Sequence, residues 1–166
     1  MFGSKSLLQK LMQGAVAGWI ATVPMTIFMQ AAWNRLPARE KYPLPPRLIT
    51  RNLLKELGVQ RQLRGKKRTA LTLFLHFGYG ALTGAVYEVL EERIRLQNIL
   101  KGTLAGLAVW AGSYLVWLPA MGILSPATRH PWRRNLLMIV AHIIWGMALG
   151  MLTRKMNRTK PYIDLE

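Results

Sequence analysis

Residues 69–87 read TALTLFLHFGYGALTGAVY, a stretch of 19 residues without a formally charged side chain. Three more such runs occur at residues 11–34, 102–128 and 135–153, and all 23 basic and 7 acidic residues lie outside the four runs. A helix needs roughly 20 residues to cross a hydrocarbon core about 30 Å thick. A charged side chain near the centre of such a helix costs about 3 kcal/mol. The pattern therefore predicts an all-α integral membrane protein.

The same exclusion of charge argues against a soluble helical protein. Soluble amphipathic helices repeat charged residues every three or four positions along one face, and these four runs contain none. We expect a single membrane domain, a four-helix bundle joined after its first span by a basic connection at residues 34–68. The expected spans lie at about residues 11–33, 69–90, 99–124 and 135–153.

The overall charge indicates the kind of surface that the protein meets. The net charge of +16 suits anionic lipid headgroups, because each basic residue near them contributes about 1 kcal/mol. Nucleic acid is the alternative partner for such charge and is less favoured. The chain has no cysteine, which excludes thiolate metal sites and iron–sulfur clusters held by this chain.

The first connection concentrates basic residues and contains a predicted short helix between Pro46 and Gly58. Ile49, Leu53 and Leu57 recur at spacing four, which is typical of an amphipathic helix at the membrane interface or of a solvated connector helix. We expect the basic side chains to form a surface for anionic lipid or for a protein partner. These are Arg47, Arg51, Lys55, Arg61, Arg64, Lys66, Lys67 and Arg68.

The two halves of the chain share a glycine pattern. The first and third spans each begin with Gly-x-x-x-Gly, and the second and fourth each contain His-x-x-aromatic-Gly-x-x-x-Gly. This repetition predicts a duplicated two-helix unit in which small residues allow close helix packing. The shorter motifs are Gly14 with Gly18 and Gly102 with Gly106; the longer ones are His76, Tyr79, Gly80 and Gly84, and His142, Trp145, Gly146 and Gly150.

His76 and His142 stand at matching depths, each eight residues after a flanking arginine. In an up-down bundle both imidazoles would lie about 12 Å below the same boundary, where histidine usually faces the interior or a water-filled cavity. Three uses are open. The rings pack and bond a neighbouring oxygen, titrate along a proton or solute path, or ligate a haem or chlorin lying over the glycines. The glycines that would support such a macrocycle are Gly80, Gly84, Gly146 and Gly150.

Constellations of catalytic residues are missing from the sequence. No carboxylate lies within the core of any span, so an acid–base pair cannot be assembled at membrane depth, and His130 in the third connection has no nucleophile nearby. We expect no enzyme and no metal site. The acidic residues that end the second span are expected to anchor it through ion pairs. They are Glu88, Glu91 and Glu92, with Arg93, Arg95 and Lys101 as the available partners.

Several short motifs resemble those of the YagU-like bacterial inner-membrane family. They are residues 101–106 (KGTLAG), residues 118–122 (LPAMG), Pro131-Trp132, His142 and Trp145. The resemblance covers roughly residues 70–150 and includes the His76 span. It implies a multi-pass inner-membrane protein of uncharacterised function and supplies no catalytic residue. The basic first connection departs from that family.

Basic residues also predict an orientation. The first and third connections hold fourteen Lys and Arg, against nine on the side of the termini and second connection. The positive-inside rule places the richer side in the cytoplasm and both termini outside, whereas the family resemblance implies termini inside. We expect the charge rule to decide.

The expected function is that of a non-enzymatic accessory or interaction subunit, within a larger membrane complex. Two alternatives use His76 and His142. One is transport of protons or a small solute along a path through both side chains. The other is a tetrapyrrole carrier in an energy-converting complex, with haem or chlorin as the cofactor.

Overall fold

The computed structural model describes residues 6–158, and every regular element in that range is helical. Four helical segments are long and apolar enough to cross a membrane: Leu7–Asn34, Gly65–Arg93, Asn98–Ala120 and Trp132–Arg158. The prediction of an all-α chain with four membrane-length helices is therefore confirmed. Each segment except the third exceeds its charge-free run by several residues, because charged residues at the ends of a span can continue a helix beyond the apolar layer.

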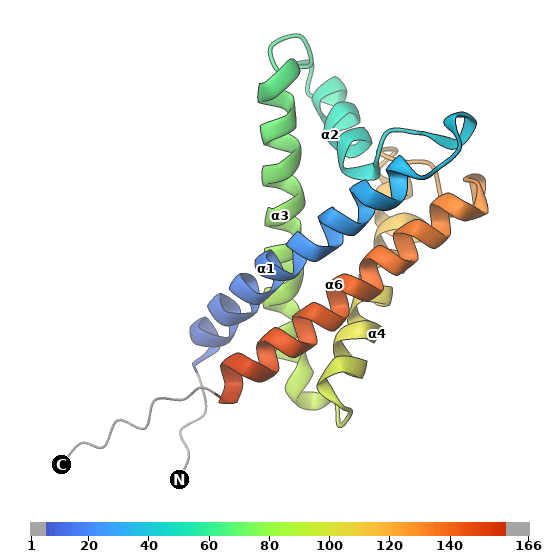
Figure 1. The fold of residues 1–166 in the computed structure, drawn as a ribbon. Coiled ribbons are helices and arrows are strands. Elements are labelled where there is room, and N and C mark those ends of the chain that lie inside the picture. The colour runs from blue at the N-terminus through green and yellow to red at the C-terminus, as the bar shows by residue number, and fades with distance from the viewer. Residues whose placement is uncertain (1–5, 159–166) are drawn as a thin grey trace, which may run out of the picture.

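The four long segments form an up-down arrangement. Successive long helices run in opposite directions, so α1 begins and α6 ends at the same end of the molecule (Figure 1). The longer elements are α1 (Leu7–Asn34), α2 (Pro45–Glu56), α3 (Gly65–Leu90), α4 (Asn98–Ala111) and α6 (Trp132–Arg158). Short elements are η1 (Ala38–Glu40), η2 (Glu91–Arg93), the π-helical η3 (Gly112–Trp117), α5 (Leu118–Ala120) and η4 (Ala127–Arg129).

Local sequence explains where several helices begin and end. At the start of α1 the Ser6 hydroxyl accepts from the Gln9 backbone N–H, while the Gln9 side chain accepts from the Ser6 backbone N–H. This reciprocal pair satisfies two donors that the first turn leaves open. Near the other end of the bundle, Gly122 takes a positive φ of 67°. That conformation suits glycine and turns the chain after α5.

The short helix predicted in the first connection is α2, with prolines in its first turn and Gly58 just beyond its end. The buried positions of α2 do not follow its apolar repeat. Leu57 is 64 % exposed, while Thr50 and Leu54 are buried. The reason is that α2 packs against α3, so the buried face is set by that helix and is offset by one residue from the apolar repeat.

Glycines bring the long helices together in two pairs. Gly14 and Gly18 of α1 lie against Gly84 and Gly80 of α3, where a Cβ on Gly84 would come within 2.7 Å of the Gly18 Cα. In the same manner Gly102 and Gly106 of α4 lie against α6. There a Cβ on Gly146 would come within 2.8 Å of the Gly102 carbonyl carbon, and one on Gly106 within 3.3 Å of the Gly146 Cα. The two halves thus use their repeated motifs in equivalent contacts.

The contacts between the two pairs are unequal. In the repeated motif Trp145 of α6 corresponds to Tyr79 of α3, and Gly18 corresponds to Gly106. The Trp145 indole donates to the Gly18 carbonyl oxygen at 3.2 Å. In an equivalent arrangement Tyr79 would donate to the Gly106 carbonyl oxygen, but its hydroxyl bonds the Ser113 hydroxyl instead, at 2.9 Å. As a result α1 and α6 run side by side through the centre of the molecule, while α3 and α4 make little direct contact (Figure 1). The space between α3 and α4 is where the internal cavities lie.

Candidate functional site

A cavity of about 330 Å³ lies between the long helices, and residues of α2 form part of its wall. Its walls are mostly apolar, with a few hydroxyl and imidazole groups among them. Cavities of this composition and size fall at the small end of the range for ligand sites. The polar and aromatic side chains in its walls are Thr22, Thr50, Thr72, His76, Tyr79, Thr83, Ser113, Tyr114, Trp117, His142 and Trp145.

The structure brings His76 and His142 to this one cavity, which we call the histidine cavity. The Nδ1 of His142 lies 2.7 Å from the Met138 backbone oxygen. Because a carbonyl oxygen can only accept, Nδ1 carries the hydrogen and Nε2 of the neutral ring is left as an acceptor. The Tyr114 ring meets the His142 ring edge-on, at 5.8 Å between centroids, and holds its plane.

His76 has a different environment although its motif is the same. Its Nε2 is buried and makes no hydrogen bond to any described residue. The ring packs edge-on against Phe77 at 5.9 Å between centroids. A buried polar nitrogen without a partner costs about 1–3 kcal/mol, so a ligand or water in the cavity that bonded His76 would remove that cost.

A second cavity of about 510 Å³ lies on the other side of Tyr79 and Ser113. Both residues line both cavities, and their mutual hydrogen bond stands at the border. The second cavity reaches Glu91 and Lys101 near the end of α3. The two hollows therefore follow one another along the gap between α3 and α4.

The glycines of the repeated motifs lie in helix–helix contacts, and Gly80 also borders the histidine cavity. Gly80 and Gly84 face α1, and Gly146 and Gly150 face α4, all at distances that leave no room for a Cβ. Gly14, Gly18, Gly102 and Gly106 form the other sides of these contacts. A flat macrocycle has no room over glycine faces that are already covered by a helix. The repeated glycines thus serve helix packing, and the histidines line a cavity that Gly80 alone among these glycines also lines.

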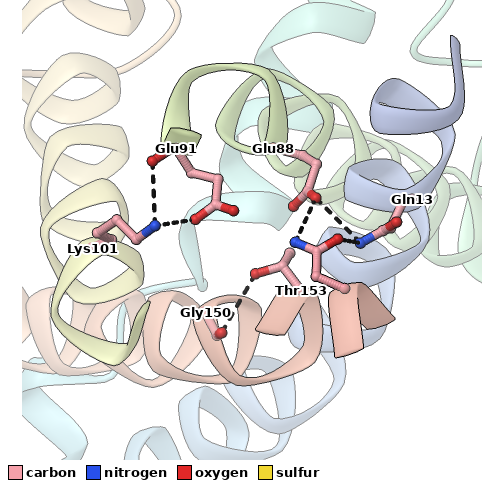
Figure 2. A network of polar contacts seen from close by, with 7 residues as sticks. Gln13, Glu88, Glu91, Lys101, Gly150 and Thr153 are labelled. Carbon is pink, nitrogen blue, oxygen red and sulfur yellow. Dashed lines mark hydrogen bonds and ion pairs between the residues drawn. The ribbon is translucent and has the colours of Figure 1, made fainter. Parts of the chain in front are cut away.

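A polar cluster that the sequence did not reveal surrounds Glu88 at the far end of α3 (Figure 2). Glu88 is only 3 % exposed. Its Oε1 accepts from Gln13 Nε2 at 3.2 Å and from Asn157 Nδ2 at 3.1 Å, and Gln13 Nε2 also donates to Asn157 Oδ1 at 2.6 Å. The cluster ties α1, α3 and α6 together. Its one sequence signal is the step of four residues from His76 through Gly80 and Gly84 to Glu88, which places Glu88 on the packed face of α3.

The ion pairs near the second connection follow one of the expected combinations. Glu91 pairs with Lys101, and both side chains are buried. Lys101 also donates to the Glu91 backbone oxygen at 3.2 Å (Figure 2). Glu92 instead pairs with Lys10 at 2.6 Å across to α1, at a more exposed position. The buried pair closes the end of the gap between α3 and α4.

The basic residues of the first connection separate into two groups. Four arginines line a hollow of about 440 Å³ beside the start of α3, and four other basic residues lie outside it. The lining residues are Arg51, Leu54, Gln60, Arg61, Arg64 and Arg68. Those outside are Arg47, Lys55, Lys66 and Lys67. The eight basic side chains look alike in the sequence, but the fold places only four of them around this hollow.

His130 lies in the third connection, away from the histidine cavity. Arg134 donates to its Nδ1 at 3.3 Å. Burial lowers the pKa of His130, and the neighbouring Arg134 charge lowers it further, against a smaller opposite effect of the Ser125 backbone. In the described part of the chain, no three His, Asp or Glu side chains gather as a metal site.

Four helices that are long and apolar enough to cross a membrane, packed around a cavity, are typical of multi-pass helical membrane proteins. Within that class, the chain belongs to a family described as proteins of unknown function (DUF1440), whose model matches residues 25–151. The match covers the last third of α1, all elements from η1 to η4 and most of α6; residues 7–24 of α1 and residues 152–158 of α6 lie outside it. No curated protein and no solved structure matches the chain.

Proposed function

We propose that this protein is a non-enzymatic accessory protein of the bacterial inner membrane that binds a small, mostly apolar ligand in the histidine cavity. The observation that carries the proposal is the pairing of an apolar cavity with two imidazoles, one of which has a buried Nε2 without a partner. Its location is supported by the four membrane-length helices and by the resemblance to YagU-like proteins. The basic connection faces anionic headgroups or a neighbouring subunit.

The imidazoles restrict the chemistry of the ligand. The acceptor Nε2 of His142 favours a ligand that carries a hydroxyl or N–H donor. The apolar walls favour a hydrocarbon or aromatic body, and burial of each CH₂ contributes about 0.8 kcal/mol. We therefore infer a neutral amphipathic molecule, such as a phenol or an alcohol, as the ligand class.

Tryptophan fluorescence tests this proposal, because Trp117 and Trp145 line the cavity. We would titrate the detergent-solubilised protein with 4-bromophenol and with 4-bromotoluene, which differ only by a hydroxyl in place of a methyl group. Saturable quenching should favour the phenol by roughly tenfold, the equivalent of one good hydrogen bond. The preference should vanish in His142→Leu and persist in His130→Leu, which alters a histidine outside the cavity. Quenching that does not saturate, or that is the same in His142→Leu, would contradict the proposal.

A second candidate is transport, favoured by the two cavities in series on either side of the Tyr79–Ser113 hydrogen bond. On this proposal the bond closes a path from His76 and His142 toward Glu91. Liposomes that contain the protein and an internal pH dye would report the rate at which protons leak across the membrane. Equal leak rates for the native protein and for the double variant His76→Ala/His142→Ala would count against a histidine path, with His130→Ala as the control.

A tetrapyrrole carrier has less support, since the glycine faces are covered and the cavity is small. Its test is a visible spectrum of protein purified from cells that make haem. A Soret band that is lost in His76→Ala would revive it.

A further inference from the structure

Four arginines from three consecutive segments converge on the hollow beside the start of α3, which we call the arginine pocket. Arg51 comes from α2, Arg61 and Arg64 come from the loop that follows, and Arg68 lies in the first turn of α3. Leu54 and Gln60 complete the lining, and none of the six residues is acidic. The fold thus collects four positive charges around one hollow of about 440 Å³.

Within residues 6–158, no acidic side chain forms an ion pair with these four arginines. The three ion pairs among residues 6–158 use Lys10, Lys101 and Arg133, and none uses an arginine of the pocket. Like charges held together repel one another, and a bound anion would relieve that repulsion. The pocket is therefore better suited to a negatively charged ligand than to an empty state.

The beginning of α3 adds to the same effect. Its first turn contains no acidic residue, and no side chain caps its N-terminus. The backbone N–H groups of that turn are left without an internal partner and carry a partial positive charge. Such a helix start attracts phosphate groups. Two of the four arginines, Arg64 and Arg68, flank this helix start, so the helix and the side chains attract an anion to the same place.

The position along the chain identifies the source of the anion. Arg68 directly precedes the charge-free residues 69–87, so the pocket lies where a spanning helix leaves the apolar layer. Lipid phosphates occupy that level. The planar guanidinium matches phosphate with two parallel hydrogen bonds, which a lysine cannot form, and all four basic residues that line the pocket are arginines.

We propose that the arginine pocket binds the phosphate group of an anionic phospholipid. The inference rests on the membrane location in the proposed function but not on any ligand in the histidine cavity. The lipid holds α2 against the start of α3 and thereby stabilises the wall that α2 contributes to the histidine cavity.

The experiment compares two variants that remove the same charge from the same connection. The pocket variant is Arg51→Gln/Arg61→Gln/Arg64→Gln/Arg68→Gln, and the control variant is Arg47→Gln/Lys55→Gln/Lys66→Gln/Lys67→Gln. Each is titrated in mild detergent with phosphatidylglycerol, with phosphatidylcholine and with inorganic phosphate, and the midpoint of thermal unfolding is measured. Phosphatidylglycerol should raise the midpoint of the native and control proteins by roughly 5 °C at saturation. The pocket variant should lose most of that rise.

Each alternative outcome has a defined meaning. An equal loss in both variants would show diffuse attraction by the whole basic surface and would overturn the pocket. A rise of the same size with inorganic phosphate would show a site for a free anion, and would overturn the lipid. If the pocket variant does not fold, Arg61→Gln/Arg64→Gln against Lys66→Gln/Lys67→Gln gives the same comparison with half the charge removed. Bromophenol quenching of the native protein without added lipid reports on the histidine cavity by itself, so the two proposals can fail independently.

Discussion

Trp145 of α6 donates its indole N–H to the backbone oxygen of Gly18 in α1, and this hydrogen bond links the two glycine-packed helix pairs. Trp145 is 2 % exposed. Trp145→Phe keeps most of the buried aromatic surface and removes the donor. We expect it to lower the free energy of unfolding by about 1 kcal/mol. Denaturant unfolding in detergent measures this, with Trp132→Phe as the matched control at a position that is 68 % exposed; equal effects would rule out the hydrogen bond as the cause.

Gly18→Ala should destabilise the protein by about 1–3 kcal/mol, because the added Cβ meets the α3 backbone and the helices must move apart. The nearest Cα, that of Gly84, would lie 2.9 Å away. Gly78→Ala is the control on α3, since a Cβ there meets nothing within 4 Å. That control should be neutral or slightly stabilising, as alanine favours a helix over glycine. Similar losses in both variants would refute the packing role of Gly18.

Lys101→Met leaves the Glu91 carboxylate buried without its partner, and we expect a loss of about 3–5 kcal/mol. The double variant Glu91→Gln/Lys101→Met should be more stable than Lys101→Met alone, because no charge remains to be buried. Glu92→Gln should cost at most about 1 kcal/mol, since its pair with Lys10 is exposed. A complete cycle of unfolding measurements checks this, and additive losses would contradict the coupling.

The lowered pKa of His130 predicts that the free energy of unfolding depends on pH. Its pKa is lowered in the folded protein, mainly by burial and then by Arg134, so the unfolded chain binds a proton more readily. The contribution of neutral His130 to the free energy of unfolding is therefore fully present above the unfolded-state pKa of about 6.5. It is lost as the pH drops through the lower folded-state pKa. His130→Gln should flatten the unfolding free energy between about pH 5 and pH 7 relative to the native protein. A native curve that rises toward acid in this window would reverse the predicted sign.

The absence of cysteine allows a direct test of orientation. Gln62→Cys lies in the first connection and Gln97→Cys in the second, and both positions are exposed. If the charge rule holds, a membrane-impermeant maleimide added to spheroplasts labels Gln97→Cys and not Gln62→Cys. The reverse labelling would place the termini inside, as the YagU-like resemblance implies.

The four long helices were predictable from sequence because lipid excludes charged side chains, so each span appears as a charge-free run. The equal depth of His76 and His142 followed from the same borders, and both do line one cavity. Their different environments could not be inferred. His142 bonds the backbone oxygen of Met138, four residues earlier. The residue that corresponds to Met138 in the other half is Thr72, whose hydroxyl bonds the Arg68 oxygen.

The Glu88 cluster was missed for a related reason. From sequence, Glu88 stands at the end of a span beside other acidic residues and resembles an interfacial anchor. Its partners Gln13 and Asn157 come from the first and last helices, so only the packing of all three helices buries it. Likewise, eight basic residues of the first connection were alike in sequence, and the turn after α2 decides which four share the arginine pocket.

The contact between α1 and α6 has a consequence for how the protein is made. The first pair, α1 with α3, is complete once residue 90 has been synthesised, and it can pack in the membrane at that stage. The histidine cavity needs walls from α4 and α6 as well, and α6 leaves the ribosome after the other three long helices. A nascent chain that stops after residue 129 would therefore hold the packed pair of α1 and α3 without the Trp145 donor to Gly18, so the site is assembled only after α6 has been made.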